Sequence, residues 1–154
     1  MRILVMSDSH GTKSNMFDAI SIESPDVVLY LGDNIRDCED IESKYPKIML
    51  RAVKGNCDHG YRGLDIDEFV LEGKKIFMTH GHLYSVKLGK AKILDAATSR
   101  GADIVLFGHT HIPYQSENDG LFALNPGSIG AGGKSYAVLE LKNGAIEYTF
   151  GNLQ

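Results

Sequence analysis

Residues 2–10 read RILVMSDSH, in which the apolar run 3–6 leads into two side chains able to bind metal, Asp8 and His10. Continuous apolar runs with β-branched residues are typical of strands buried on both faces of a sheet. Four further runs behave in the same way: residues 27–31 precede Asp33, 48–53 precede Asn56, 76–78 precede His80, and 104–107 precede His109. The sequence therefore predicts buried strands with polar side chains at their carboxyl ends.

Two helical patterns lie among these runs. In residues 14–22, Ser14 is placed to cap the first turn, while Met16, Phe17 and Ile20 share one helix face. Residues 86–99 form the second pattern. Alternating strands and helices indicate an α/β fold whose ligands bind at the carboxyl ends of strands.

The carboxyl-terminal part of the chain has a different pattern. Apolar runs at residues 121–124, 135–141 and 145–150 are separated by turns such as Lys142-Asn143-Gly144. Short runs joined by Asn-Gly turns are typical of antiparallel strands. Together with the preceding pattern, they predict an α/β sandwich.

All six histidines lie in short motifs that also contain Asp, Asn or Gly: His10, His59, His80, His82, His109 and His111. Asp8 and His10 are two residues apart, and so are His109 and His111. Such pairs converge only from extended or loop backbone, because two residues span about 200° around a helix. These imidazole and carboxylate groups predict a metal site that folding assembles from distant segments.

Composition excludes several other classes of protein. A chain of 154 residues with 43% hydrophobic residues fits one globular domain, residues 1–154. The net charge is −4 and the basic residues form no stripe, which argues against nucleic acid as a partner. Two cysteines do not make a disulfide framework, and the first apolar run is too short for a signal peptide or membrane span. We therefore expect a cytoplasmic protein with no membrane partner.

In chain order, Asp8-X-His10, Gly32-Asp33, Gly55-Asn56, His80 and Gly108-His109-X-His111 resemble the motifs of the calcineurin-like metallophosphoesterase family. The short chain and the segments Gly55-Asn56-Cys57-Asp58, Thr79-His80-Gly81-His82 and Asn125-Pro126-Gly127-Ser128 resemble its small bacterial and archaeal phosphodiesterase branch. The resemblance implies a four-layer α-β-β-α sandwich of two mixed β-sheets flanked by helices. It also implies a centre with two divalent metal ions.

The resemblance further implies which residues hold the metals. One ion would be bound by Asp8, His10, Asp33 and His111. The other would be bound by Asp33, Asn56, His80 and His109, so that Asp33 bridges the ions. Imidazole, carboxylate and amide ligands together suit transition metals better than Ca²⁺ or Mg²⁺ alone. The resemblance favours Mn²⁺, with Ni²⁺, Zn²⁺, Fe²⁺ and Mg²⁺ as the other candidates.

The implied reaction is hydrolysis of a small phosphodiester through attack of a metal-bridging hydroxide on phosphorus. Two divalent ions, two carboxylates and a hydroxide leave the centre at about +1, so it attracts phosphate although the whole chain is negative. The candidate catalytic residues are Asp33, Asn56, Cys57, Asp58 and His82. The partner is thus a small phosphoester substrate, and the resemblance is also compatible with a homo-oligomer that completes the pocket.

Cys57 departs from the family pattern, in which a histidine usually follows the asparagine. That histidine is taken to protonate the leaving alkoxide, and a thiol is a poorer proton donor near neutral pH. The departure predicts a preference for diesters or activated esters, with His59, His82 or water as other proton sources. In a second interpretation, Cys57 only fills space beside the metals.

Other motif residues have supporting or open roles. Asp58 is expected to orient a neighbouring histidine or water, His82 to support His80, and His59 to be exposed. The Gly-rich segment 125–133 is either a turn that walls the site or a phosphate-binding loop, although it lacks the Lys-Ser/Thr ending of a P-loop. Lys87, Lys90 and Lys92 fit either a solvated helix face or a site for anionic substrates.

A second function fits the same fold. A retromer subunit of this fold acts mainly through protein contacts and has a degenerate metal site, so the alternative to an enzyme is a protein-binding scaffold with a vestigial metal site. All seven expected ligand positions carry a usable donor here, which favours catalysis. A purely structural metal site is a third alternative, which the sharing of Asp33 disfavours.

Overall fold

The computed structural model describes residues 1–130 and 132–154, and its first β-sheet forms around the run that opens the chain. β1 (Arg2–Met6) pairs in parallel with β2 (Val27–Tyr30), which pairs in parallel with β3 (Met49–Ala52). On the other side of β1, β9 (Ser135–Lys142) and β10 (Ala145–Asn152) add two antiparallel strands. The order of this first sheet is therefore β10-β9-β1-β2-β3.

The second β-sheet has the order β4-β5-β6-β8-β7. β5 (Lys74–Thr79), β6 (Ile104–Leu106) and β8 (Leu121–Pro126) are parallel neighbours. β4 (Ile66–Leu71) and β7 (Pro113–Asn118) pair antiparallel at the two edges. Both sheets are thus mixed.

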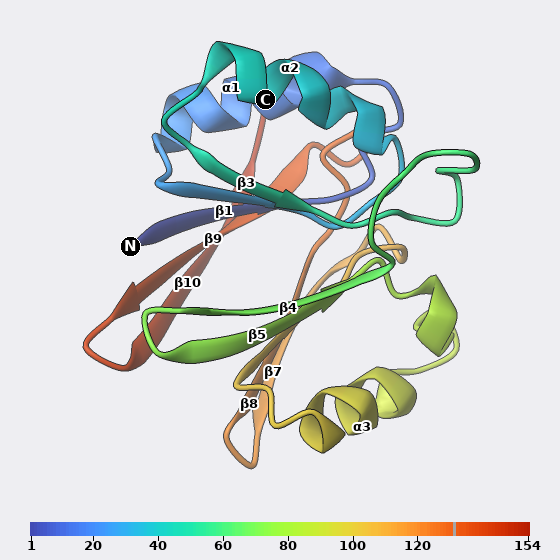
Figure 1. Ribbon diagram of the computed structural model, residues 1–154, viewed down its shortest axis with the longest axis vertical. Helices are drawn as coiled ribbons and strands as arrows, with labels where there is room; N and C mark the ends of the chain where they lie inside the picture. Colours follow the sequence, from blue (N-terminus) through green and yellow to red (C-terminus); the bar gives the residue numbers. More distant parts are fainter. Residues whose placement is uncertain (131) are drawn as a thin grey trace.

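Helices cover the outer faces of the two sheets (Figure 1). α1 (Lys13–Glu23) and α2 (Glu39–Lys44) lie over the first sheet, and α3 (Ala91–Ser99) lies over the second. Two short 3₁₀ helices, η1 (Ile35–Cys38) and η2 (His82–Tyr84), lie between strands in the chain. The expected four-layer α-β-β-α sandwich is confirmed. Among the described residues, no helix is both long enough and apolar enough to cross a membrane.

Burial on both faces explains why β1, β2 and β6 appear in the sequence as continuous apolar runs. β3 was also expected to be buried but is only partly so, because it lies at the edge of its sheet. Ile3 and Val5 of β1 belong to the core between the two sheets. Leu4 and Met6 belong to the core on the other face, together with Met16 of α1. These four side chains of β1 have no exposed surface, and burying each one contributes about 1.5–3 kcal/mol to stability. β1 is therefore fixed in position, and so is the loop that follows it.

The two long helices start at different places from those expected. The helix expected over residues 86–99 begins only at Ala91, because Ser85 is left-handed, with a φ of 52°, and Leu88 closes a turn onto it. Leu88 is 91% exposed and offers no buried helix face. Ser14 is not the cap of α1, because it lies inside the helix.

The carboxyl-terminal strands are only partly antiparallel. β9 and β10 form the expected hairpin, with Asn143 and Gly144 in left-handed backbone at its turn. Residues 121–124, however, belong to β8, which pairs in parallel with β6 as well as antiparallel with β7. β8 is an interior strand of its sheet, so it has a partner on each side, β6 and β7.

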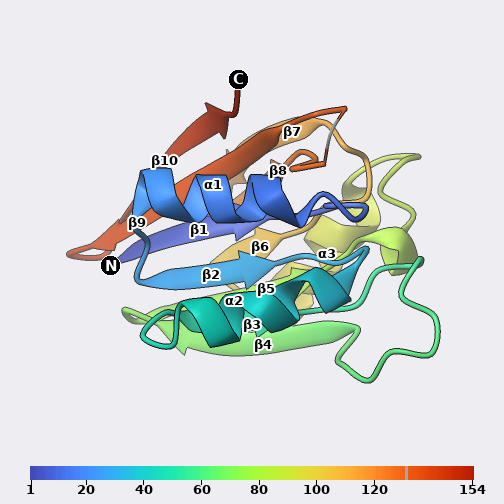
Figure 2. The same cartoon turned by 90° about the horizontal axis from the view of Figure 1, so that it is seen from above.

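Loops that carry the metal-ligand candidates meet at one edge of the sandwich. β1 and β2 run in the same direction, so the loops after them emerge together (Figure 2). The Asp8 N–H donates to the Gly32 carbonyl across these loops at 2.9 Å. In the second sheet, the Gly108 N–H donates to the His80 carbonyl at 2.9 Å in the same manner. The sandwich thus brings four ligand-bearing loops together in pairs.

Candidate metal centre

Five of the seven expected ligands have left-handed backbone. The φ angle is 58° at Asp8, 46° at His10, 65° at Asp33, 71° at His109 and 62° at His111. Residues other than glycine avoid this region, at a cost of roughly 1–2 kcal/mol each. Strain of this kind is concentrated at functional sites. The pairs Asp8/His10 and His109/His111 therefore share one strained loop geometry.

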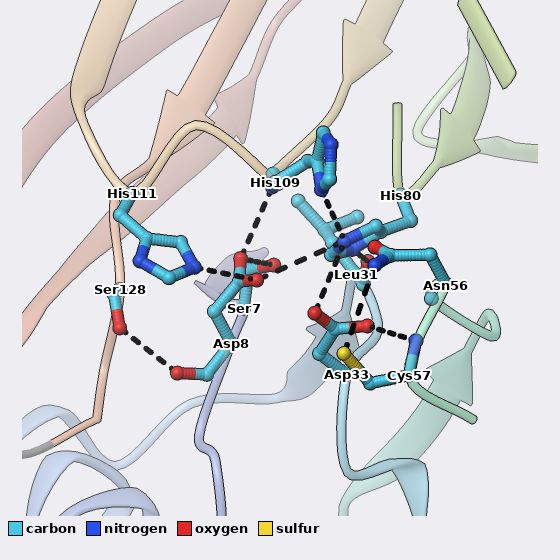
Figure 3. Close-up of polar contacts among 12 residues, drawn as sticks. Ser7, Asp8, Leu31, Asp33, Asn56, Cys57, His80, His109, His111 and Ser128 are labelled. Atoms are coloured by element: carbon cyan, nitrogen blue, oxygen red, sulfur yellow. Dashed lines mark hydrogen bonds and ion pairs between the residues drawn. The ribbon is translucent and has the colours of Figure 1, made fainter. Parts of the chain in front are cut away.

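Asp8, His10 and His111 form the first group of donors. Figure 3 shows Asp8 and His111 of this group. Oδ1 of the buried Asp8 lies 3.1 Å from His111 Nε2 and 3.7 Å from His10 Nε2. The Nε2 atoms of the two imidazoles are 3.2 Å apart. Asp8 Oδ2 accepts hydrogen bonds from Ser7 Oγ at 2.5 Å and from the His109 N–H at 3.1 Å. The carboxylate is thus held from behind while Oδ1 faces the histidines.

Asp33, His80 and His109 lie opposite this first group. His80 Nε2 is 3.5 Å from Asp33 Oδ2 and 3.2 Å from His109 Nδ1. His80 Nδ1 donates to the Leu31 carbonyl at 2.7 Å, which fixes the ring and turns Nε2 toward the centre. The side-chain amide of Asn56 points toward the same centre (Figure 3).

The donor set fits divalent metal ions. Candidate ligand atoms lie within 4.8 Å of one another in two groups, Asp8 with His10 and His111, and Asp8 with Asp33 and His80. Asp33 Oδ2 also lies 3.9 Å from His10 Nε2. Both carboxylates, rather than Asp33 alone, therefore lie between the histidines of the two sides. Imidazole nitrogens and carboxylate oxygens that face one another in this way are typical ligands of Mn²⁺, Fe²⁺, Ni²⁺ and Zn²⁺.

Asp33 and His109 have protonation states that suit metal binding, whereas His80 differs: burial lowers its pKa, but contact with Asp33 and Asp8 outweighs burial and raises that pKa above its usual value. Burial alone would raise the pKa of Asp33, but hydrogen bonds from His80 and from the Cys57 N–H outweigh it and hold this pKa well below its usual range. Burial, followed by the charges of His80 and Lys87, lowers the pKa of His109 to about 4. At neutral pH, Asp33 is thus a carboxylate and His109 has a free lone pair, as metal binding requires.

Two glycines allow the backbone to pack directly against the two carboxylates. A Cβ atom at Gly108 would lie 2.0 Å from Ser7 Oγ and 2.9 Å from Asp8 Oδ2. A Cβ atom at Gly55 would lie 2.0 Å from Asp33 Oδ1. No larger residue fits at either position without moving a carboxylate.

Asp58 accepts hydrogen bonds from the backbone, contacts that the sequence did not predict. Its buried carboxylate accepts N–H bonds from Asp33 at 2.9 Å, from Gly55 at 2.8 Å and from Ile35 at 3.0 Å. Asp58 therefore ties the loop that carries Asp33 to the loop that carries Asn56.

The substitution Asp58→Asn is expected to lower the free energy of unfolding by about 2–4 kcal/mol. The amide NH₂ group cannot accept a hydrogen bond, so at least one buried N–H loses its partner. Urea unfolding followed by circular dichroism measures this loss. Asp65→Asn is the matched control, because Asp65 is exposed and pairs with Lys54 at 3.8 Å. Equal destabilisation by both substitutions would contradict the role assigned to Asp58.

Tyr30 is a site residue that sequence reasoning missed. Its buried hydroxyl accepts the Ser9 N–H at 3.0 Å and donates to the Asp33 carbonyl. It therefore connects the loop after β1 to the loop after β2. The only signal in the sequence was a tyrosine within an apolar run, since a buried tyrosine hydroxyl usually requires a polar partner.

The segment 125–133 borders a cavity beside the first group of donors, although Ala131 within it lies outside the described residues. The cavity measures about 480 Å³ and is lined by His10, Thr12, His111, Ser128, Gly130, Gly132 and Gly133. Ser128 Oγ also donates to the Asp8 carbonyl at 2.9 Å. The segment thus supports a ligand loop and walls the cavity beside His10 and His111.

The remaining candidates surround the centre. Cys57 is exposed as a residue. Partial burial of its thiol, followed by the charge of Asp33, raises the pKa of the thiol, which is therefore protonated at neutral pH. The ring centre of His82 lies 5.5 Å from that of His80, and its Nδ1 is buried without a hydrogen-bond partner in the described part of the chain. Burial lowers the pKa of His82. His59 is exposed, as expected.

Known proteins are similar to this chain in sequence. Residues 1–144 match the model of the calcineurin-like phosphoesterase superfamily domain. The chain is 34% identical to the probable metallophosphoesterase YsnB of Bacillus subtilis, over 97% of this chain and 90% of the relative. It is 31% identical to a phosphodiesterase of Methanocaldococcus jannaschii, over 82% of this chain and 83% of the relative.

Solved structures share the fold. A predicted phosphoesterase from Streptococcus pneumoniae matches with a TM-score of 0.81 and 28% identity, over 98% of this chain and 88% of the other. Zinc-complexed Vps29 from Entamoeba histolytica matches with a TM-score of 0.77 over 99% of each chain, but its 20% identity shows the fold alone. The superfamily model covers all the loops that form the metal centre, and we conclude that the chain belongs to the calcineurin-like phosphoesterase superfamily.

Proposed function

We propose that this phosphoesterase is a two-metal phosphodiesterase that hydrolyses small phosphodiesters. The observation that carries the proposal is the pair of donor groups that share Asp8, with five candidate ligands held in left-handed backbone. Strain at five ligands is costly to maintain without a function that uses the site. The relatives named as metallophosphoesterases and phosphodiesterases support the same reaction class.

The side chains divide the work of binding and orientation. Asp8, His10 and His111 would hold one ion, and His80, His109 and Asn56 the other, with Asp33 shared between the two ions. When bound, two such ions supply a nucleophilic hydroxide and neutralise the charge that develops on the phosphoryl group. The family resemblance favours Mn²⁺, and the ligand types are equally compatible with Ni²⁺, Zn²⁺ and Fe²⁺, with Mg²⁺ as the remaining candidate. The cavity beside His10 and His111 then receives one arm of the ester.

Hydrolysis of bis-p-nitrophenyl phosphate tests this proposal directly. The metal-stripped protein is resupplied with Mn²⁺, Ni²⁺, Zn²⁺ or Mg²⁺, and its turnover is compared with that of the monoester p-nitrophenyl phosphate. Diester turnover that is restored by metal supports the proposal. Binding of two ions without turnover of either ester would overturn it.

Cys57→His is expected to lower the ratio of diester to monoester turnover by about tenfold or more. An imidazolium protonates a poor leaving group better than a thiol does, and general acid catalysis commonly contributes a hundredfold or more. The backbone N–H of residue 57, which donates to Asp33 Oδ1 at 2.9 Å, is retained in the variant. Cys57→Ser is the control for side-chain size. An unchanged ratio in Cys57→His would reject the role given to this position.

A protein-binding scaffold is the alternative function, and the likeness to Vps29 is the observation that favours it. That likeness extends to the fold alone, whereas the donor groups described above are intact. The scaffold proposal gains weight if the chain binds metal but turns over no ester. The free cysteines Cys38 and Cys57 support a reducing compartment, and we propose the cytoplasm as the location.

A further inference from the structure

A second cavity lies beside the metal centre. It measures about 220 Å³ and is bordered by Val86, Lys87, Lys90, Thr110, Ile112 and Tyr114. Thr110 stands between the candidate ligands His109 and His111, so the cavity shares a loop with the metal centre. A substrate bound at the metals has this cavity within reach of one of its arms.

Two lysines make the second cavity positively charged. The lysine ion pairs within the described residues belong to Lys13, Lys54 and Lys75, so Lys87 and Lys90 have no carboxylate partner there. No residue that lines the cavity is acidic. The cavity is thus a local site for a negative group on a chain whose net charge is −4.

The sequence left two interpretations of Lys87, Lys90 and Lys92, a solvated helix face or a site for anionic substrates. The position of Lys92 distinguishes between them. Lys92 lies in α3 and borders a different cavity, next to Leu88. Lys87 and Lys90 precede α3, and therefore do not belong to a solvated helix face. The structure thus divides the cluster into two lysines beside the centre and one apart from it.

Apolar and aromatic side chains form the rest of the wall of the second cavity. Ile112 is 67% exposed although it borders the cavity, and Tyr114 stands beside it with Lys90 Nζ 5.3 Å from its ring centre. A flat ring fits against such a surface, and a phosphate attached to that ring would meet the lysines.

We propose that the preferred substrate is a phosphodiester with a second phosphate on one arm, as in a phosphorylated nucleoside, and that Lys87 and Lys90 bind this second phosphate. The inference rests on the proposed phosphodiesterase function, because it places the scissile phosphate at the metals. The first cavity, with its glycine-rich and uncharged wall, then receives the other arm.

Two chromogenic esters that differ in a single phosphate test this proposal. One is thymidine 5′-(p-nitrophenyl phosphate), and the other carries an additional 3′-phosphate on the same thymidine. Release of p-nitrophenolate by the Mn²⁺-loaded protein gives kcat/KM for each ester. We expect the 3′-phosphorylated ester to be preferred by roughly tenfold, the combined effect of two partly exposed lysine–phosphate contacts. Raising the salt concentration should reduce this preference, because exposed charge pairs are screened.

Substitutions show which residues cause the preference for the 3′-phosphorylated ester. Lys87→Gln with Lys90→Gln should bring the ratio of the two kcat/KM values close to one, whereas Lys92→Gln should leave the ratio as it is in the unaltered chain. The ratio cancels any common change in metal loading or folding. A ratio near one in the unaltered chain, or an equal ratio in all variants, overturns the inference. Absence of turnover of both esters and of bis-p-nitrophenyl phosphate would instead reject the phosphodiesterase function itself.

Discussion

Asp33→Asn is expected to reduce the metal-dependent turnover of bis-p-nitrophenyl phosphate by roughly a thousandfold. Asp33 Oδ2 lies 3.5 Å from His80 Nε2 and 3.9 Å from His10 Nε2, between the two groups of donors. An amide at this position removes one of the two negative charges that face the histidines. The site should then lose affinity for at least one ion, and with it the charge that a phosphoryl group needs.

Metal titration by isothermal calorimetry, run beside the activity assay, shows which step fails in Asp33→Asn. We expect fewer than two ions to bind at the concentrations that saturate the unaltered chain. Asp65→Asn again serves as the control, since it changes the charge equally at an exposed residue that belongs to neither donor group. Turnover within tenfold of the unaltered chain would show that Asp33 is not a shared ligand, and Asp8, which belongs to both donor groups, would be tested next.

Gly108→Ala is expected to weaken metal binding by about 10- to 100-fold without removing any donor. The new Cβ atom would lie 2.9 Å from Asp8 Oδ2 and closer still to Ser7 Oγ, which holds that carboxylate. The backbone has little freedom to retreat. The Gly108 N–H donates to the His80 carbonyl at 2.9 Å, and the buried Asn125 amide donates to the Gly108 carbonyl at 2.9 Å. The Asp8 carboxylate must therefore turn away from His10 and His111.

The same substitution should also cost about 1–3 kcal/mol of stability, because it overpacks a buried position. Gly89→Ala is the matched control, since a Cβ atom there meets no atom within 4 Å. Metal affinity and urea unfolding should both be nearly unchanged in Gly89→Ala. If Gly108→Ala binds two ions as tightly as the unaltered chain, the close packing of backbone against Asp8 has no part in forming the site.

Sequence reasoning succeeded where burial leaves a strong pattern. Residues 3–6 are buried on both faces and could be identified as a strand at once, whereas β7 was missed. β7 reads PYQSEN, with no apolar run, and it exists because the edge of β8 needs a partner. α2 was missed for a similar reason, because Ile41 is the one fully buried side chain of that helix. Both elements depend on tertiary contacts more than on local preference.

The candidate site residues divide in the same way, into those that the sequence reveals and those that depend on tertiary contacts. The histidines and Asp33 could be named from residue type and position, because few side chains bind transition metals. The role of Asp58 could not be predicted, because its partners are backbone amides from two other parts of the chain. Nor could the left-handed backbone at Asp8 and His109, since φ angles are imposed there by the packing of the loops.

The left-handed ligands also bear on how such a chain changes over generations. Glycine adopts this backbone without penalty, so a mutation from any of the five ligands to glycine relieves local strain while it removes a donor. At His10, His109 and His111 such an exchange would remove the strain and the metal donor together. At Asp8 and Asp33 it would also leave the Ser7 hydroxyl and the Cys57 N–H without their acceptors. Backbone strain and metal donor are therefore inseparable at the three histidines.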